Sequence, residues 1–368
     1  MSETTSYRLV NVSGTVPAPI THWAPVLVPR EAIEAEIQRL ADEPAPADGR
    51  RAAVIVHPEC VDGTQGFAPG VDVTIEVLKP GEQTRPMLRN SNQIHFGIQG
   101  SGAIQVGKET LATGKWDVAS IPSMQPYSCK NTGKELWVRL VYSNAPLLRK
   151  LGVHWSDYAQ PGWEIKAIAS TAGVNVDINR ANAPDIQISA EGARLRGYEF
   201  LTDIEVVENR PLVWPWESAT PLLSRERGDG LRNIILLYNP ATERRNGTTH
   251  SFFATLFSIP KGVPPRPVTR GHKHSSVAIN YHFVGQGKSV VDDETIHWKT
   301  GDLLLSGPSW SEHAHYYDGH GAQVLTIQDH PLHIGMESLI WQERMDGPIL
   351  NLGSEAGQKG YVGPRQAG

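Results

Sequence analysis

The sequence predicts an all-β protein built from two similar β-barrels, and three observations support that prediction. Turn-forming residues are abundant, with 35 glycines and 27 prolines among 368 residues. Short runs that alternate apolar and polar residues fill two separate regions, as half-buried strands do. The second region repeats the first at a distance of about 185 residues, which indicates a duplicated domain.

Five segments follow from this pattern. Residues 1–50 are expected to form an arm, which lies on the surface or packs on a second subunit. Within it, residues 30–42 carry Ile33, Ile37 and Leu40 at the spacing of a short amphipathic helix. The remaining segments are a first barrel, a linking region, a second barrel and a tail: residues 51–150, 151–235, 236–345 and 346–368.

The alternation also predicts individual strands, which glycine, proline and asparagine separate. Short helices are expected at residues 147–151 and 214–226. Strands are expected at residues 71–78, 93–99, 103–106, 116–121 and 136–142 of the first barrel, and at 234–238, 252–259, 276–284, 288–291, 302–306 and 323–328 of the second.

Composition excludes several classes of protein. Apolar residues make up 39% of the chain and charged residues 20%, as in a water-soluble globular protein. The net charge of −5 predicts no nucleic-acid or membrane partner. Cys60 and Cys129 form no disulfide framework, so a reducing cytoplasm is expected. Residues 1–5 lack the features of a signal peptide, and no apolar run approaches the length of a membrane helix.

One motif carries chemistry: Gly271-His272-Lys273-His274, followed by Pro308-Ser309-Trp310-Ser311-Glu312-His313-Ala314-His315. In a strand, side chains two residues apart point to the same face, so His272 and His274 can reach one ion. His313 would complete a set of three imidazoles, which suits iron, zinc, copper or nickel and leaves positions open for chemistry.

The repeat provides an internal comparison. His272, His274 and His313 correspond to Met87, Arg89 and Tyr127 of the first barrel, which make no plausible set of metal ligands. We therefore expect one metal ion per chain, in the second barrel.

Several further motifs resemble the cupin superfamily. These are the Pro-x-Gly at Pro260, the His-x-His pair, the Gly-x-Gly at Gly285, Gly301-Asp302 and the turn from Pro308 to His315. The duplication makes the chain similar to a bicupin, with two double-stranded β-helix (jelly-roll) barrels. The subfamily it resembles most is the ring-cleaving gentisate and salicylate 1,2-dioxygenases, on Tyr238-Asn239-Pro240-Ala241-Thr242 and Pro211-Leu212-Val213-Trp214-Pro215-Trp216.

The resemblance implies an extradiol-type dioxygenase that adds O₂ across the bond between the carboxylate- and hydroxyl-bearing carbons of gentisate or a substituted salicylate. It implies Fe(II), ahead of Mn(II), and a homo-oligomer, often a tetramer. The family usually carries the metal in its first cupin. It also places an arginine eight residues after the first histidine, where this chain has Asn280.

Other residues are candidates for the site. The resemblance gives His315 an acid–base or oxygen-orienting role, although it could be a core histidine. It also places Asp329 near the site, where Asp329 could fix an imidazole tautomer or lie in a surface turn. The remaining candidates are Asn280 and His282 as pocket lining, Arg270 as a nearby cation and Trp310 as packing beneath the site. Four other histidines are expected in loops or at the surface: His297, His320, His330 and His333.

Two other functions stay open. A bicupin decarboxylase or isomerase would use manganese, zinc or nickel, because one fold hosts many reactions. A non-catalytic bicupin would bind a small ligand, but it would need no open metal site.

Overall fold

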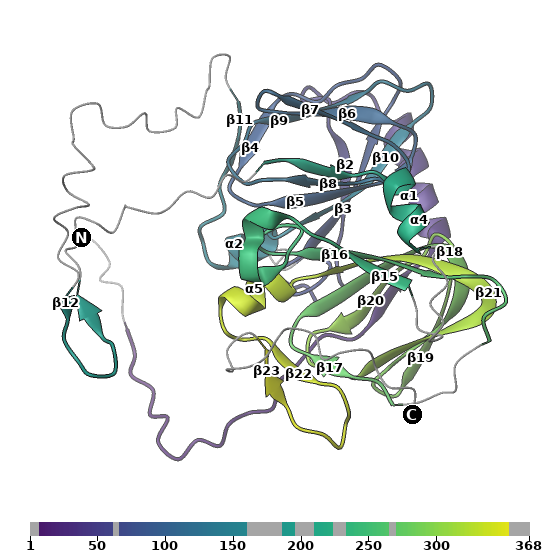
Figure 1. Ribbon diagram of the computed structural model, residues 1–368. Coiled ribbons are helices and arrows are strands. Elements are labelled where there is room, and N and C mark those ends of the chain that lie inside the picture. Colours follow the sequence, from purple (N-terminus) through teal and green to yellow (C-terminus); the bar gives the residue numbers. More distant parts are fainter. Residues whose placement is uncertain are drawn as a thin grey trace, which may run out of the picture.

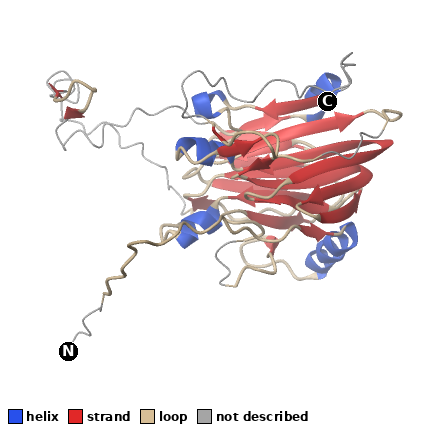
Figure 2. Ribbon diagram, turned by 90° about the horizontal axis from the view of Figure 1, so that it is seen from below, coloured by secondary structure: helices blue, strands red, loops and turns tan. Residues whose placement is uncertain are grey.

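The computed structural model describes residues 7–61, 66–159, 186–195, 210–223, 233–264 and 270–352. Antiparallel strands dominate these residues, and a few short helices lie at their periphery (Figures 1 and 2). The predicted all-β class is confirmed.

The first barrel is formed by two sheets. The order of the six-stranded sheet is β14-β8-β5-β10-β3-β2, and the order of the five-stranded sheet is β11-β4-β9-β6-β7. Their strands are β2 (Arg51–Ile55), β3 (Asp72–Leu78), β4 (Met87–Arg89), β5 (Gln93–Gln99), β6 (Gly102–Val106), β7 (Glu109–Thr113), β8 (Val118–Ile121), β9 (Tyr127–Asn131), β10 (Trp137–Ser143), β11 (Ser156–Tyr158) and β14 (Leu212–Trp214).

The second barrel has a seven-stranded sheet, in the order β1-β20-β18-β21-β16-β15 with β19 on β18, and a three-stranded sheet, β17-β22-β23. Their strands are β1 (Val26–Val28), β15 (Asn233–Leu237), β16 (Phe253–Ile259), β17 (Lys273–His274), β18 (Val277–Val291), β19 (Glu294–Lys299), β20 (Leu303–Pro308), β21 (His313–Gln328), β22 (Ile340–Gln342) and β23 (Leu350–Asn351). A separate hairpin joins β12 (Ile186–Gln187) to β13 (Arg194–Leu195).

Two strands predicted at residues 276–284 and 288–291 are one long strand, β18. Its register against β21 shifts near Gly285, whose φ is +97°. A Cβ there would meet the Gly321 carbonyl oxygen at 2.2 Å. Glycine thus bends the strand without ending it, and for that reason the sequence pattern reads as two strands.

The helices are α1 (Arg30–Asp42), α2 (Ala145–Lys150), α4 (Trp216–Leu223), α5 (His330–Gly335) and the 3₁₀ helix η2 (Pro240–Arg245). Helix α1 has the predicted bounds, and it buries Ile33 and Leu40 against the first barrel. Strand β1 precedes it directly and pairs with β20 of the second barrel, so residues 26–42 join the two barrels (Figure 1). None of the helices in the described ranges is long and apolar enough to cross a membrane.

The two barrels meet through an aromatic cluster. Phe283 on β18 lies 5.7 Å from Phe96 on β5, 4.8 Å from Trp116 and 5.3 Å from Trp216, between ring centroids. Such pairs contribute about 0.5–1.5 kcal/mol each beyond their burial. These contacts stabilise the position of β18, which runs through the second barrel beside the candidate site.

Strand pairing confirms the internal repeat. Met87 pairs with Tyr127 in the first barrel, and His272 bridges to His313 in the second. The offset predicted from sequence therefore places the same backbone contact in both halves.

A side-chain bond repeats in the same way. Asn144 Oδ1 accepts a hydrogen bond from Asn92 N at 3.1 Å, and Asp329 Oδ1 accepts one from Val277 N at 2.8 Å. Each acceptor immediately precedes a short helix, α2 or α5. The two halves thus keep the same local architecture with different chemistry.

Candidate metal centre

Three histidines converge on one point of the second barrel. The backbones of His272 and His313 bond to each other, N to O, at 3.2 and 3.0 Å, and His274 lies on β17. Ring centroids are 5.4 Å apart for His272 and His274, 4.5 Å for His272 and His313, and 4.7 Å for His274 and His313. All three side chains are buried, and their ligand atoms lie within 4.8 Å of one another.

Backbone carbonyls orient two of the rings. His274 Nδ1 lies 2.9 Å from Ser276 O, and His313 Nδ1 lies 3.0 Å from Ser311 O. A carbonyl only accepts, so each Nδ1 carries its proton and each Nε2 keeps a lone pair. Three buried imidazoles, with a lone pair on Nε2 of His274 and of His313, fit a divalent transition-metal ion.

Gln328, at the end of β21, contacts the same ligand atom. Its Nε2 lies 3.1 Å from His274 Nε2. An amide nitrogen only donates, so this contact agrees with a lone pair on His274 Nε2.

Trp341 on β22 packs against the triad, and sequence reasoning missed it. Its ring stacks on His272 at 4.8 Å and 26°, and on His274 at 5.0 Å and 24°. The residue is 2% exposed, and its Nε1 donates to Glu343 Oε2 at 3.0 Å. The register that pairs Trp341 with His274 puts the indole there.

His330 corrects a prediction, because it is not at the surface. It is 2% exposed, and its Nδ1 lies 2.7 Å from Ser276 Oγ, which lies 2.9 Å from His274 Nδ1. Burial, and then the neighbouring His333 and His313, lower the pKa of His330 to about 3, so its imidazole is neutral at pH 7. A serine thus joins this buried histidine to a ligand, whereas His297 and His320 are exposed as predicted.

Asp329 lies beside this group, and its carboxylate contacts a backbone amide and His333. Its Oδ1 accepts from Val277 N, and its Oδ2 lies 3.4 Å from His333 Nε2. Although burial acts to lower it, the bond to Asp329 raises the pKa of His333. The two tautomers of the ligand histidines described above are set by backbone carbonyls instead.

His315 lies beyond the triad on β21, with its ring centroid 5.9 Å from that of His313. Its Nδ1 lies 2.8 Å from Ser289 Oγ, which also accepts a bond from Trp298 Nε1 at 3.1 Å. Because the indole N–H donates to Ser289 Oγ, the serine hydroxyl remains free to donate to His315 Nδ1. This arrangement favours the tautomer of His315 that carries its proton on Nε2.

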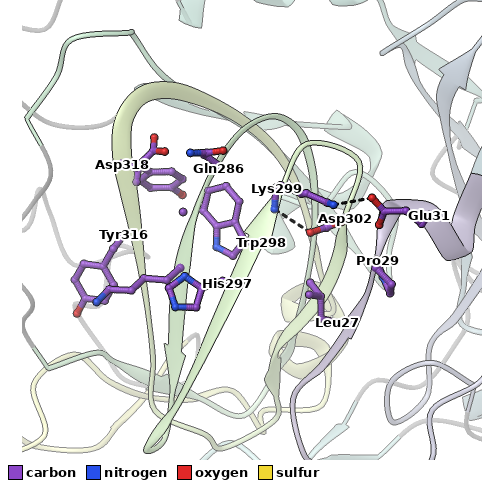
Figure 3. Close-up of a pocket in the computed structure, with 13 residues that line it drawn as sticks. Leu27, Pro29, Glu31, Gln286, His297, Trp298, Lys299, Asp302, Tyr316 and Asp318 are labelled. Carbon is purple, nitrogen blue, oxygen red and sulfur yellow. Dashed lines mark hydrogen bonds and ion pairs between the residues drawn. The ribbon is translucent and has the colours of Figure 1, made fainter.

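His282 stacks on the other side of this group, on Trp298, at 3.8 Å and 10°. It is 1% exposed, and neither ring nitrogen has a hydrogen-bond partner among the residues that the structure describes. Burial lowers the pKa of His282 to about 3. Trp298 itself is among the residues that line a pocket of 760 Å³, with His297 and Tyr316 (Figure 3).

Asn280 is buried in the barrel wall. Its Nδ2 donates to Ser306 Oγ at 2.6 Å, and its Oδ1 accepts from Thr326 Oγ1 at 2.7 Å. Both ends of the amide are therefore engaged, and Asn280 brings no charge to the site.

Two other predicted residues, Arg270 and Trp310, lie at the edge of the three-histidine site. The Arg270 side chain is 75% exposed and pairs with Glu312, which also accepts from Gly271 N at 2.9 Å. Arg270 thus braces the loops that carry His272 and His313. Trp310 is half-buried, and no ring contact joins it to a described histidine.

The corresponding position of the first barrel holds different chemistry. Tyr127 Oη donates to Gln93 Oε1 at 3.2 Å and lies 3.8 Å from Met87 Sδ. A phenol, a thioether and the nearby Arg89 guanidinium stand where the second barrel has three imidazoles.

These features define the class: a bicupin with a three-histidine centre in its second barrel. No family model matches the chain. Its fold is similar to salicylate 1,2-dioxygenase from Pseudaminobacter salicylatoxidans, with a TM-score of 0.68 at 13% identity over 90% of this chain and 91% of that one. The same dioxygenase has been solved as adducts with gentisate.

Two curated relatives are also 1,2-dioxygenases. A gentisate 1,2-dioxygenase from Streptomyces sp. is 28% identical over 151 residues, which are 38% of this chain and 36% of that protein. A 1-hydroxy-2-naphthoate 1,2-dioxygenase from Nocardioides sp. strain KP7 is 23% identical over 290 residues, 77% of this chain and 68% of that protein. The chain thus matches just over a third of the length of the first relative. The predicted likeness to gentisate and salicylate 1,2-dioxygenases is confirmed.

Proposed function

We propose that the chain is an Fe(II)-dependent dioxygenase that cleaves the ring of a hydroxybenzoate, either gentisate or a substituted salicylate. The observation that carries the proposal is the buried triad of His272, His274 and His313 in a fold similar to salicylate 1,2-dioxygenase. The names of the relatives support the reaction class.

The protein would hold the ion through the Nε2 atoms of His274 and His313, together with His272. Three neutral ligands preserve the charge of the ion and leave adjacent positions for two partners. When bound, ferrous iron would supply a template for the acid and O₂ and a route for electrons between them.

The chain's own residues bind, orient and exclude water. Trp341 covers two of the ligands with an apolar ring, which limits access of water from that side. His315 is proposed to orient an oxygen atom or move a proton through Nε2, with Ser289 holding its other nitrogen. Asp329 is proposed to act indirectly, by holding Val277 and the start of α5.

His282 and Asn280 are proposed to line the substrate pocket. The unpartnered nitrogens of His282 are suited to bind a polar ring substituent. Because Asn280 is uncharged, the carboxylate would depend on the metal for its counter-charge. Arg270 and Trp310, at the rim, are proposed to act on loop shape and access.

The oligomer and the compartment are also proposals. Tyr7, Leu9 and Val16 are 87%, 91% and 82% exposed, which supports an arm that packs on another subunit of a homo-oligomer such as a tetramer. The two cysteines are free, which supports a cytoplasmic setting.

The test is anaerobic reconstitution with Fe(II), followed by oxygen uptake with gentisate and 5-substituted salicylates. We expect one O₂ consumed per acid, with a rise in ultraviolet absorbance from an open-chain dienoic acid. His274→Ala should abolish turnover, whereas His320→Ala, which removes an exposed histidine, should not. Loss of CO₂ without oxygen uptake would instead indicate a decarboxylase.

A further inference from the structure

Buried polar atoms without partners gather at one end of the first barrel, between β4 and α2. They are Arg89 Nε, Ser91 Oγ, Gln93 Nε2, Arg149 Nε and His154 Nε2, for which no described residue supplies a hydrogen bond. Ser91 and Gln93 are 0% exposed. Because an unpaired buried donor is costly, a concentration of them points to a missing acceptor.

Local bonds hold these residues together. Arg89 pairs with Ser156 on β11, and Asn90 and Trp155 exchange bonds at 3.0 and 2.9 Å, so His154 is held against the end of β4. Burial, followed by Arg89 and Arg149, lowers the pKa of His154. Both guanidinium groups therefore act electrostatically on the His154 ring.

The orientation of the Gln93 amide is set by its neighbours. Arg139 Nη1 lies 3.1 Å from His95 Nδ1, and because arginine only donates, this Nδ1 accepts. His95 Nε2 therefore carries the proton and donates to Gln93 Oε1 at 3.3 Å, as Tyr127 Oη does at 3.2 Å. The two protons on Gln93 Nε2 are left to meet an acceptor from outside this network.

Positive charge exceeds negative charge here. Glu76 is shared by Arg50 and Arg139, at 2.7 and 2.9 Å, and Asp72 is paired with Arg149 at 2.9 Å. Arg89 has no ion pair among the described residues. Its guanidinium is thus the surplus cation of the group.

Comparison with the second barrel indicates how this arose. Arg89 stands at the position of the ligand His274, and Ser91 at that of Ser276. Asn144 stands at the position of Asp329, so an uncharged amide replaces the carboxylate at that position. Where the second barrel has a metal ligand, the first barrel therefore has a positively charged guanidinium with uncharged polar neighbours.

We propose that this end of the first barrel binds a small organic acid, with its carboxylate on the Arg89 guanidinium and within reach of Ser91 Oγ and Gln93 Nε2. Arginine matches the geometry of a carboxylate through two parallel N–H bonds. The site is separate from the metal centre and does not rest on the proposed reaction.

The test is calorimetric titration of the full-length chain with benzoate, both as purified and after removal of metal by a chelator. We expect one binding event that persists without metal and in His274→Ala. Arg89→Gln should weaken it by roughly tenfold or more, as the loss of a charge-assisted pair does, and Ser91→Ala should weaken it less.

Arg344→Gln is the matched control, because it removes an exposed arginine that pairs only with Asp346 in the described part of the chain. It should leave benzoate affinity unchanged. Unfolding curves will show whether Arg89→Gln is folded, and Ser91→Ala tests the site if it is not. Three results would overturn the proposal. They are no benzoate binding to the wild type, wild-type benzoate affinity in both Arg89→Gln and Ser91→Ala, and binding of inorganic phosphate in place of benzoate.

Discussion

Trp341 is expected to stabilise both the fold and the metal centre. Fully burying a tryptophan removes about 150–250 Å² from water, worth roughly 4–6 kcal/mol at ~25 cal/mol per Å². Since Trp341 is 2% exposed, Trp341→Ala should lower the free energy of unfolding of the metal-free protein by about 3–5 kcal/mol. Trp341→Phe keeps a stacked ring and loses the bond to Glu343, so it should cost only ~1 kcal/mol.

Trp341→Ala should also lower the affinity of the metal centre for Fe(II). His272 and His274 lose the ring that packs against both, and loss of such support typically costs 10- to 100-fold in metal affinity, so we expect roughly that range. Urea unfolding gives the first quantity, and competition with a chelator for Fe(II) gives the second. Trp155→Ala, in the matching segment of the first barrel, should leave Fe(II) affinity unchanged. Wild-type Fe(II) affinity in Trp341→Ala would refute the reasoning.

Three other expectations follow. The pKa of His282 is about 3 in the folded protein and near 6.5 in the unfolded chain. The free energy of unfolding should therefore fall as the pH falls from ~6.5 towards 3, by up to ~1.4 kcal/mol per pH unit. Urea unfolding at pH 7, 6 and 5 should show a weaker pH dependence of this free energy in His282→Gln than in the wild type. Asp329→Asn should keep the bond to Val277 N, as Asn144 does in the first barrel, yet lower the pKa of His333 measured by NMR; an unchanged pKa would contradict this. Removing residues 1–20 should reduce the mass measured by light scattering from that of an oligomer to that of a smaller species; an unchanged oligomer would contradict an arm that makes subunit contacts.

The sequence predicted much of the fold because its signals are local. Helix α1 has the predicted bounds, since its apolar spacing ends before Pro44. Strand β5 also matches, because turn residues flank it on both sides. The triad could be proposed because His272 and His274 lie two residues apart in a predicted strand, and because His313 ends the turn that begins at Pro308.

The residues that support the triad could not be found in this way. Trp341 reaches His274 only through the pairing of β17 with β22, which no local pattern encodes. The local sequence around His330 favours a loop or the surface, whereas the fold buries this ring against Phe253. The repeat places Arg89 where the second barrel has a ligand, but its lack of an ion pair among the described residues depends on side chains that only the fold brings together.

The ratio of metal to chain tests the central claim most directly. After anaerobic reconstitution with Fe(II) and removal of excess ion, elemental analysis should find one iron per wild-type chain and none in His313→Ala. Met87→Ala, at the matching region of the first barrel, should retain one. Two ions per chain, or iron retained in His313→Ala, would contradict a single centre in the second barrel.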